Sequence, residues 1–218
     1  MKTKYLFFIL VILLLSACAT TQHTPPNPVP EAKPVVPAES SNEKSMQGIS
    51  PDVKELLDKS KTRVKNIYYR YRGPETGTNL FEFYVKDTKI KYLPARELKI
   101  LDKPESYNAV YIDSTAKTAQ TYCDDRTCLY KGKKSDLNYN SAYIMTISDW
   151  AGSITSAQKV GEEVIDDRSA WKIETNKGTM WVDTFYGIPL KIESGNSKFR
   201  FEQLGVNSVQ NSDVNPSS

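Results

Sequence analysis

The chain has 218 residues, with 29 lysines and arginines against 26 aspartates and glutamates, and a formal net charge of +3. This length suits one domain with extensions, since domains commonly run to about 100–200 residues. Removal of Lys2 and Lys4 with the first segment leaves 27 basic residues against 26 acidic ones. A nearly neutral chain offers no electrostatic argument for nucleic-acid binding.

The first 17 residues have the pattern of an export signal. Lys2 and Lys4 precede an apolar run from Tyr5 to Leu15, and small residues follow it. A short basic region, an apolar core of about 7–15 residues and small residues at a cleavage point are typical of such signals. The run is shorter than the roughly 20 residues of a transmembrane helix. We expect residues 1–17 to be a signal peptide; a membrane anchor that happens to contain a cysteine is the alternative.

The stretch from Leu15 to Cys18, Leu-Ser-Ala-Cys, resembles the lipobox of prokaryotic lipoproteins. In that family the chain is cut before the cysteine, which then carries the lipid. The resemblance implies that Cys18 is lipidated and that the protein is anchored to a membrane on its extracytoplasmic side. Stable anchoring takes about two acyl chains. Ala19 and Thr20 follow without an aspartate, which in a two-membrane envelope favours the outer membrane; the cell surface is the alternative.

Residues 18–50 read as a tether. Six of the twelve prolines lie between Pro25 and Pro37, and the segment has no aromatic residue. Such a segment buries too little apolar surface to offset its ordering entropy. Proline-rich linkers favour an extended conformation that spans about 3.1 Å per residue. A ligand for a proline-recognition domain is the alternative interpretation.

Residues 51–205 are expected to form one domain without internal repeats, followed by a polar, disordered tail at residues 206–218. A helix is predicted at its start, because Ser50 suits the N-cap and Pro51 suits the first helical position. Val53, Leu56, Leu57 and Val64 then recur near one face, which Ser60 interrupts.

From Asn66 onward the apolar period changes to two, which indicates strands. Asn, Gly and Tyr-Gly turns separate the four segments of the last third, as hairpins require. A helix or loop is expected between Lys133 and Gly161, around Trp150 and Ile154. The expected strands are the segments NIYYRYRG (66–73), NLFEFYVKD (79–87), TKIKYLP (88–94), NAVYIDS (108–114), KTAQTYC (117–123), CLYK (128–131), SAWKIETN (169–176), GTMWVDTF (178–185), IPLKIES (188–194) and SKFRFEQL (197–204).

This order predicts an α+β domain or an open barrel, in which a helix covers the apolar face of a curved antiparallel sheet. The aromatic residues, 13 Tyr, 7 Phe and 3 Trp, suit strands and a core. Together they are also able to line an apolar cavity between helix and sheet.

The predicted domain contains few of the residue types that catalytic and metal sites need. The only histidine is His23, in the tether, which removes the usual histidine-assisted nucleophiles and most zinc and copper sites from the domain. No metal or cofactor is expected. Adjacent acidic pairs occur at 124–125, 162–163 and 166–167. Strand neighbours point to opposite faces, so solvated turn residues are the main interpretation, with a calcium site or a catalytic pair as alternatives.

Cys123 and Cys128 bracket four residues between two strand-like segments. A hairpin loop of this length would place them opposite each other within disulfide reach. Export supplies an oxidising compartment, and lipidation would consume Cys18. We therefore expect a Cys123–Cys128 disulfide; half of a metal site and a redox-active pair are the alternatives.

The segment 164–194 resembles the C-terminal half of the LolA-like family, the outer-membrane lipoprotein carriers and their relatives. The shared elements are Trp171, the stretch Trp181 to Asp183 and the stretch Gly187 to Lys191, while Asp166-Asp167 replaces the usual Asp-Gly turn. The resemblance implies an incomplete antiparallel β-barrel with helices over its open face and an apolar cavity for acyl chains. It identifies no ligand-binding residue.

The sequence therefore favours a membrane-anchored, non-enzymatic protein that binds lipid or lipoprotein acyl chains and takes part in their trafficking. The alternative is an envelope or cell-surface module that senses or binds another protein on the same scaffold.

Overall fold

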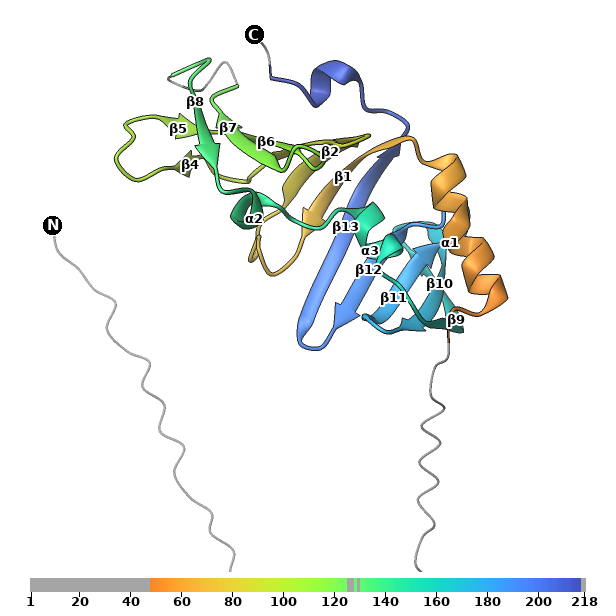
Figure 1. Ribbon diagram of the computed structural model, residues 1–218. Helices are drawn as coiled ribbons and strands as arrows, with labels where there is room; N and C mark the ends of the chain where they lie inside the picture. The colour runs from red at the N-terminus through yellow and green to blue at the C-terminus, as the bar shows by residue number, and fades with distance from the viewer. Residues whose placement is uncertain (1–47, 125–127, 129, 217–218) are drawn as a thin grey trace, which may run out of the picture. The chain divides into compact units, whose positions relative to one another are not determined.

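The computed structural model describes residues 48–124, 128 and 130–216 (Figure 1). These residues belong to one compact unit that comprises residues 44–218. The expected signal peptide, Cys18 and all but the last residues of the expected tether lie outside the described residues. Within the described part of the chain, no helix combines the length and the apolar character that a membrane crossing needs.

The first element is helix α1, Pro51–Arg63, which begins at the predicted residue. Proline lacks the N–H that a first-turn residue leaves unpaired, so Pro51 suits this position. Asp52 lies in the first turn and Lys61 and Arg63 lie in the last, where their charges oppose the helix dipole. The helix buries Val53, Leu56 and Leu57.

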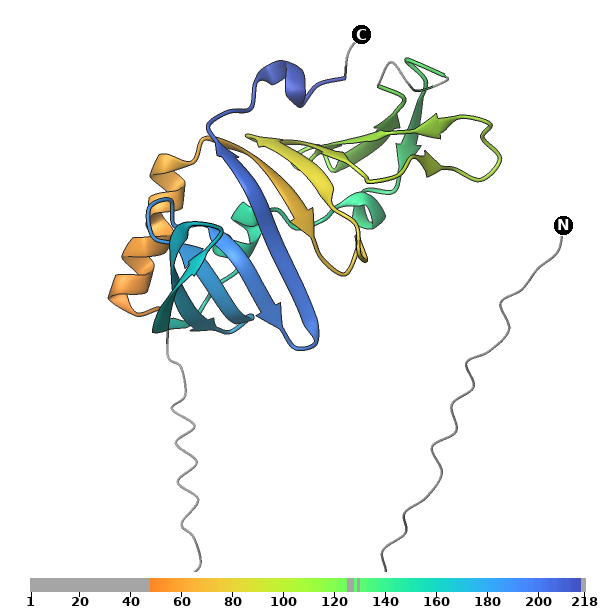
Figure 2. The same cartoon turned by 180° about the vertical axis from the view of Figure 1, so that it is seen from behind.

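An antiparallel sheet of 11 strands forms the body of the domain. Its spatial order is β8-β7-β6-β3-β2-β1-β13-β12-β11-β10-β9, and a separate hairpin pairs β4 with β5. Figures 1 and 2 show the sheet curving around the helices without closing. The expected incomplete barrel covered by helices is confirmed. The strands are β1 Asn66–Arg72, β2 Phe81–Lys86, β3 Lys89–Leu93, β4 Leu98–Lys99, β5 Ser106–Tyr107, β6 Ala109–Asp113, β7 Thr118–Tyr122, β8 Lys134–Leu137, β9 Ala157–Ile165, β10 Arg168–Thr175, β11 Gly178–Asp183, β12 Pro189–Ser194 and β13 Ser197–Val206.

The chain between β8 and β9 crosses the concave face and carries two short helices, α2 (Tyr139–Ala142) and α3 (Ile147–Gly152). We call residues 138–156 the strap. The expected helix-or-loop region from 133 to 161 thus contains the strap, but it also contains β8 and the start of β9. These two strands are defined by their pairing with β7 and β10, because their sequences do not alternate regularly between apolar and polar residues.

Leu129 of the expected strand CLYK lies outside the described residues, and Tyr130 and Lys131 lie in a turn rather than in a strand. The chain instead runs from Tyr122 at the end of β7 through a loop to Lys134, which pairs with Tyr122 across the β7–β8 ladder. The loop is therefore longer than the four residues that the cysteine spacing suggested.

The concave face is packed with aromatic side chains. Tyr69, Tyr71, Phe83 and Phe201 are each at most 1% exposed. Their rings contact one another at centroid distances of 5.2–5.6 Å, which is the range of favourable aromatic pairs. These residues act as core, and α1 and the strap pack over them.

The structure corrects the expectation of a disordered tail from residue 206. Strand β13 extends to Val206, and a single turn of 3₁₀-helix, η1, follows at Asn211–Asp213. Val209 and Val214 are 2% and 4% exposed, and Val209 N donates to Asn66 Oδ1 at 2.8 Å, so the segment packs onto the domain. The described chain continues to residue 216.

Candidate functional site

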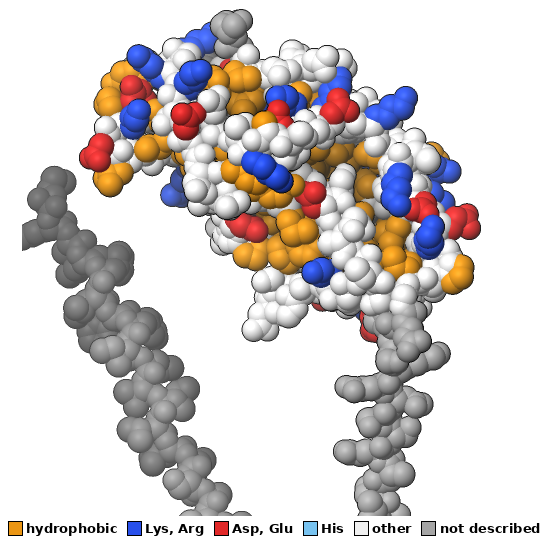
Figure 3. All heavy atoms as spheres, viewed as in Figure 1, with side chains coloured by type: hydrophobic (Ala, Val, Ile, Leu, Met, Phe, Trp, Pro, Cys, Tyr) orange, Lys and Arg blue, Asp and Glu red, His pale blue; other side chains and the backbone are white. Residues whose placement is uncertain are grey.

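A groove of about 290 Å³ lies between α1 and the strap. Its apolar surface exceeds its polar surface, and most of its lining comes from one face of α1 and the C-terminal end of α3. Figure 3 shows hydrophobic side chains gathered on this part of the surface between charged ones. We call it the α1–α3 groove; its lining residues are Ile49, Lys54, Leu57, Asp58, Ser60, Lys61, Val64, Ser148, Ala151, Gly152 and Ile154.

Local interactions fix the α3 wall of the groove. Thr146 and Asp149 form a capping box at the start of α3, in which each side chain accepts a hydrogen bond from the backbone N–H of the other residue. The Tyr143 hydroxyl donates to the same Asp149 oxygen at 2.7 Å. Trp150 packs on Phe199 with ring centroids 4.7 Å apart. The short helix is thus held by its cap and by one aromatic contact with the sheet.

Gly152 leaves part of the groove empty. A Cβ atom added at this residue would meet no other heavy atom within 4 Å. Ala151 and Gly152 are small, whereas Leu57, Val64 and Ile154 supply apolar walls. The space at the end of α3 is therefore accessible to a ligand without displacement of a bulky side chain.

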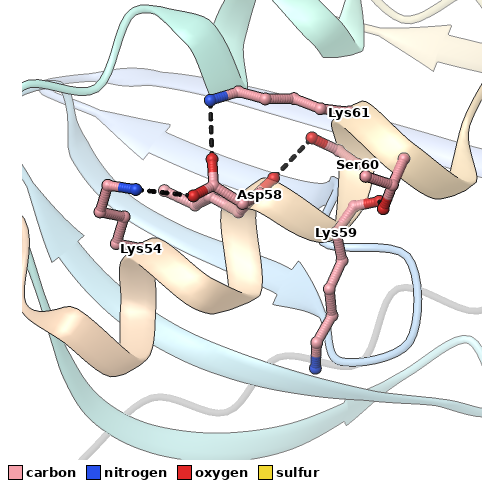
Figure 4. Close-up of polar contacts among 7 residues, drawn as sticks. Lys54, Asp58, Lys59, Ser60 and Lys61 are labelled. Carbon is pink, nitrogen blue, oxygen red and sulfur yellow. Dashed lines mark hydrogen bonds and ion pairs between the residues drawn. The ribbon is translucent and has the colours of Figure 1, made fainter.

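The rim of the groove carries a charged cluster on α1 (Figure 4). Lys54 Nζ and Lys61 Nζ lie 2.8 Å and 2.7 Å from the two carboxylate oxygens of Asp58. Hydrogen bonds from these two lysines lower the pKa of Asp58 to about 2. The hydrogen bond to Asp58 in turn raises the pKa of Lys54. The rim keeps an excess of one positive charge beside an apolar floor.

Two further α1 side chains have other roles. Lys59 points away from the rim and donates from Nζ to the Thr184 carbonyl oxygen at 3.1 Å, which ties α1 to the loop between β11 and β12. Ser60, which interrupts the apolar face in sequence, donates from Oγ to the Leu57 carbonyl oxygen at 2.6 Å. Its hydroxyl is thus paired inside the helix rather than directed at a ligand.

A larger hollow, about 480 Å³, lies where β13 bulges on the opposite face of the sheet. Each charged side chain of its lining has an ion-pair partner, which for Arg168 is Asp183 outside the hollow. Arg200 contacts Asp166 at 2.7 Å and Glu202 at 3.1 Å, and Arg168 contacts Asp183 at 3.3 Å. Because this lining is mainly polar and its described charges are mutually neutralised, the hollow suits an apolar ligand less well than the α1–α3 groove does.

The two predicted cysteines meet. Cys123 and Cys128 form a disulfide, with Cα atoms 5.6 Å apart. Cys128 lies within the loop between β7 and β8 rather than on a facing strand, so the bridge closes a segment inside the loop. Cys18, the predicted lipidation site, lies outside the described residues.

Of the adjacent acidic pairs, 162–163 and 166–167 are fully described, whereas Asp125 lies outside the described residues. Asp166 and Asp167 form the turn between β9 and β10 with φ values of 49° and 61°, a left-handed conformation in which aspartate is better tolerated than most residues. Asp124 accepts hydrogen bonds from Tyr111 and Lys91. Among the residues that the structure describes, no group of three or more histidine, cysteine, aspartate or glutamate side chains is arranged to hold a metal.

No family model matches the chain. No curated protein matches its sequence either.

Several solved structures align with about three quarters of this chain. A structure of the Mycobacterium tuberculosis lipoprotein LppX aligns with 76% of this chain and 100% of its own, at 14% identity and a TM-score of 0.44. MucB in complex with MucA(peri) aligns over 76% of this chain and 60% of its own, at 14% identity and a TM-score of 0.44. A putative outer-membrane lipoprotein-sorting domain from Vibrio parahaemolyticus aligns over 74% and 95%, at 9% identity and a TM-score of 0.26.

Likenesses at such identities and scores carry no inference about function. The function proposed for this chain therefore rests on its own residues and on the α1–α3 groove.

Proposed function

We propose that the protein is a membrane-anchored, extracytoplasmic binding protein without catalytic activity, and that it binds an acyl chain of a lipid or lipoprotein in the α1–α3 groove. The observation that carries the proposal is an apolar groove with an empty end at Gly152 and lysines on its rim. A role in lipid or lipoprotein trafficking would follow from such binding.

The chemistry of the groove supports an acyl ligand. Apolar walls from Leu57, Val64 and Ile154 stabilise a hydrocarbon chain by removing its surface from water, at roughly 25 cal/mol per Å². A volume of about 290 Å³ lies at the lower end of the range of ligand pockets, about 300–1,000 Å³. The groove therefore suits a single chain or part of one.

Sequence features support the rest of the proposal. The lipobox-like stretch that ends at Cys18 would attach the chain to a membrane, and residues 18–50 would give it reach. The only histidine, His23, lies in that segment, which favours binding over catalysis.

A groove-filling variant tests acyl binding. Gly152→Leu places a side chain into the empty end of the groove without a clash at Cβ. We expect residues 44–218 to retain a fatty acid or lipid through gentle purification and to bind a fluorescent fatty acid. Because the leucine occupies the same space, Gly152→Leu should weaken fluorescent fatty-acid binding at least about tenfold, as measured by titration.

Gly161→Leu is the matched control, since it makes the same change on β9, outside the groove, where an added Cβ has only one ordinary contact, at 3.9 Å. It should bind like the parent protein. Parent protein that is ligand-free by native mass spectrometry and fails to take up the fluorescent fatty acid would count against acyl binding.

A second candidate function is recognition of another envelope protein on the same scaffold. The filled concave face favours it, because Tyr69, Tyr71 and Phe83 occupy the space that a large lipid cavity would need. Cross-linking in intact cells followed by affinity purification tests this function. Specific recovery of one protein, together with absent fatty-acid binding, would replace the first proposal by the second.

A further inference from the structure

Strand β9, Ala157–Ile165, ends the order of the large sheet and is nine residues long. Among the described residues its outer side is bridged only at its first residue, by a parallel bridge between Ile49 and Ala157. Ser50 N donates to the Ala157 carbonyl oxygen and Ala157 N donates to the Gly48 carbonyl oxygen. The opposite end of the sheet is β8, with four residues. Within the described part of the chain, the longer free edge of the large sheet is therefore the part of β9 from residue 158 to 165.

This edge is exposed on both faces of the sheet. Val164 is 71% exposed and Val160 is 45% exposed, and Glu162 and Glu163 are exposed beside them. The second half of β9 is therefore left uncovered among the described residues. A free edge presents unpaired backbone N–H and C=O groups, and it is a template for pairing with another strand. Exposed valines on such an edge favour strand addition further.

The charges of β9 are distributed unusually. Lys159 pairs with Ile173 and Glu162 pairs with Trp171 on β10, and a register shift lies between them. Ile173 and Trp171 are two residues apart and share a face. Lys159 and Glu162 therefore share a face as well, although they are three residues apart, and their side chains form an ion pair within the chain.

An antiparallel pair of two β9 strands keeps these faces aligned. If the two-fold axis passes between Val160 and Gly161, Lys159 of one copy lies opposite the partner's Glu162, and symmetry repeats the contact. In the same register Gln158 lies opposite the partner's Glu163. Opposite charges that face each other across neighbouring strands are stabilising, whereas like charges are destabilising.

We propose that the free edge of β9 is a self-association surface, on which a second copy of this chain adds in antiparallel fashion and forms one sheet across a two-fold axis. The charge complementarity between Lys159 and Glu162 selects a second copy as the occupant. A two-fold interface satisfies both members of each pair at once, because the same surface serves both subunits.

Charge reversal tests this register directly. The full chain is purified in a mild detergent, and its self-association is measured by sedimentation velocity. In Lys159→Glu each copy places glutamate opposite glutamate, and in Glu162→Lys each copy places lysine opposite lysine. Each variant alone should dimerise about tenfold more weakly than wild type, because two cross-strand pairs change from attractive to repulsive.

The mixture of the two variants is the decisive sample. A heterodimer of Lys159→Glu with Glu162→Lys restores both cross-strand pairs, while the ion pair within each chain remains broken. Association should return to about the wild-type level in the mixture. A variant that fails to fold would also prevent this recovery, and circular dichroism would detect the loss of folding. In that case Lys159→Gln and Glu162→Gln replace the charge-reversal variants, and each is expected to weaken dimerisation.

Lys198→Glu is the control, because it reverses an exposed lysine on β13, away from the edge. It should leave dimerisation unchanged. The proposal would be overturned if the wild type were monomeric. It would also be overturned if the mixture associated no better than the separate variants. Either result would apply if the edge bound a foreign extended peptide instead of a second copy.

Discussion

At the scale of single residues, Gly187 determines how closely the β11–β12 loop approaches α1. Its φ is +69°, and an added Cβ would lie 2.1 Å from the Leu56 carbonyl oxygen. The preceding turn is fixed by Asp183, whose Oδ1 accepts hydrogen bonds from the backbone N–H groups of Phe185 and Tyr186. Only glycine meets both demands, a left-handed backbone and contact with a helix.

Gly187→Ala should therefore destabilise the domain by roughly 3 kcal/mol, since strain in the left-handed region adds to displacement of α1. Gly195→Ala is its control. Gly195 also has a positive φ, +56°, but an added Cβ there has no neighbour within 4 Å, so about 1 kcal/mol is expected. Urea unfolding of residues 44–218 measures both losses. Equal losses would mean that the approach of the loop to α1 contributes little to stability.

At the scale of elements, the strap is the part of the fold that the sequence predicted least well. The strands of the last third follow period two and end in Gly or Asn turns, so their positions were predictable. Helices α2 and α3 have only four and six residues, too few for a helical period to emerge. Their positions depend on caps and on contacts with the sheet, which a single sequence does not display.

One such contact is testable. Tyr92 of β3 is 6% exposed and donates its hydroxyl hydrogen to the Ala142 carbonyl oxygen of α2 at 3.1 Å. Burial raises the pKa of Tyr92 to about 12. Tyr92→Phe leaves that carbonyl without this donor and should cost about 1 kcal/mol in the free energy of unfolding. Hydrogen exchange of the strap amides should accelerate at the same time.

Tyr122→Phe provides the comparison, because its hydroxyl contacts only the nearby Gln120 side chain among the described residues. Its stability and the exchange rates of the strap should stay within experimental error of wild type. If Tyr92→Phe behaved in the same way, the hydroxyl would not hold the strap.

At the scale of the whole molecule, the carboxylate of Asp113, at the end of β6, makes the stability of the fold depend on pH. Asp113 accepts hydrogen bonds from Lys89 Nζ and from the backbone N–H groups of Thr115 and Ala116. These contacts, led by Lys89, lower its pKa from 3.8 to about 2. Because the folded-state pKa is lowered, the stabilisation is present above about pH 4 and is lost as the pH falls toward 2.

Asp113→Asn removes this titration. The variant should be less stable than wild type at neutral pH, and its free energy of unfolding should fall less steeply between pH 4 and 2, so that the two proteins converge near pH 2. Guanidinium unfolding at a series of pH values measures the convergence. Parallel curves across this range would show that Asp113 does not contribute through its charge.

The architecture could be predicted from the sequence to a useful extent, but the site could not. Alternating residues such as Phe83 and Val85 indicated the sheet, and the α1 period gave Leu57 as an apolar wall. The groove arises where α1 meets the strap, and Gly152 and Ile154 reach it only through tertiary packing. The cysteine spacing led to the right pair although the loop around it is longer than expected.

The bridge at Ile49 also has a mechanical consequence. Any pull on the chain before Gly48 acts first on two backbone hydrogen bonds, Ser50 N to the Ala157 carbonyl and Ala157 N to the Gly48 carbonyl. Behind them lies the first turn of α1, not a central strand. Tension applied at this end would break these two hydrogen bonds and then strain α1 before the force reached the central strands. The segment around Ile49 is therefore the mechanically weakest part of this end of the domain.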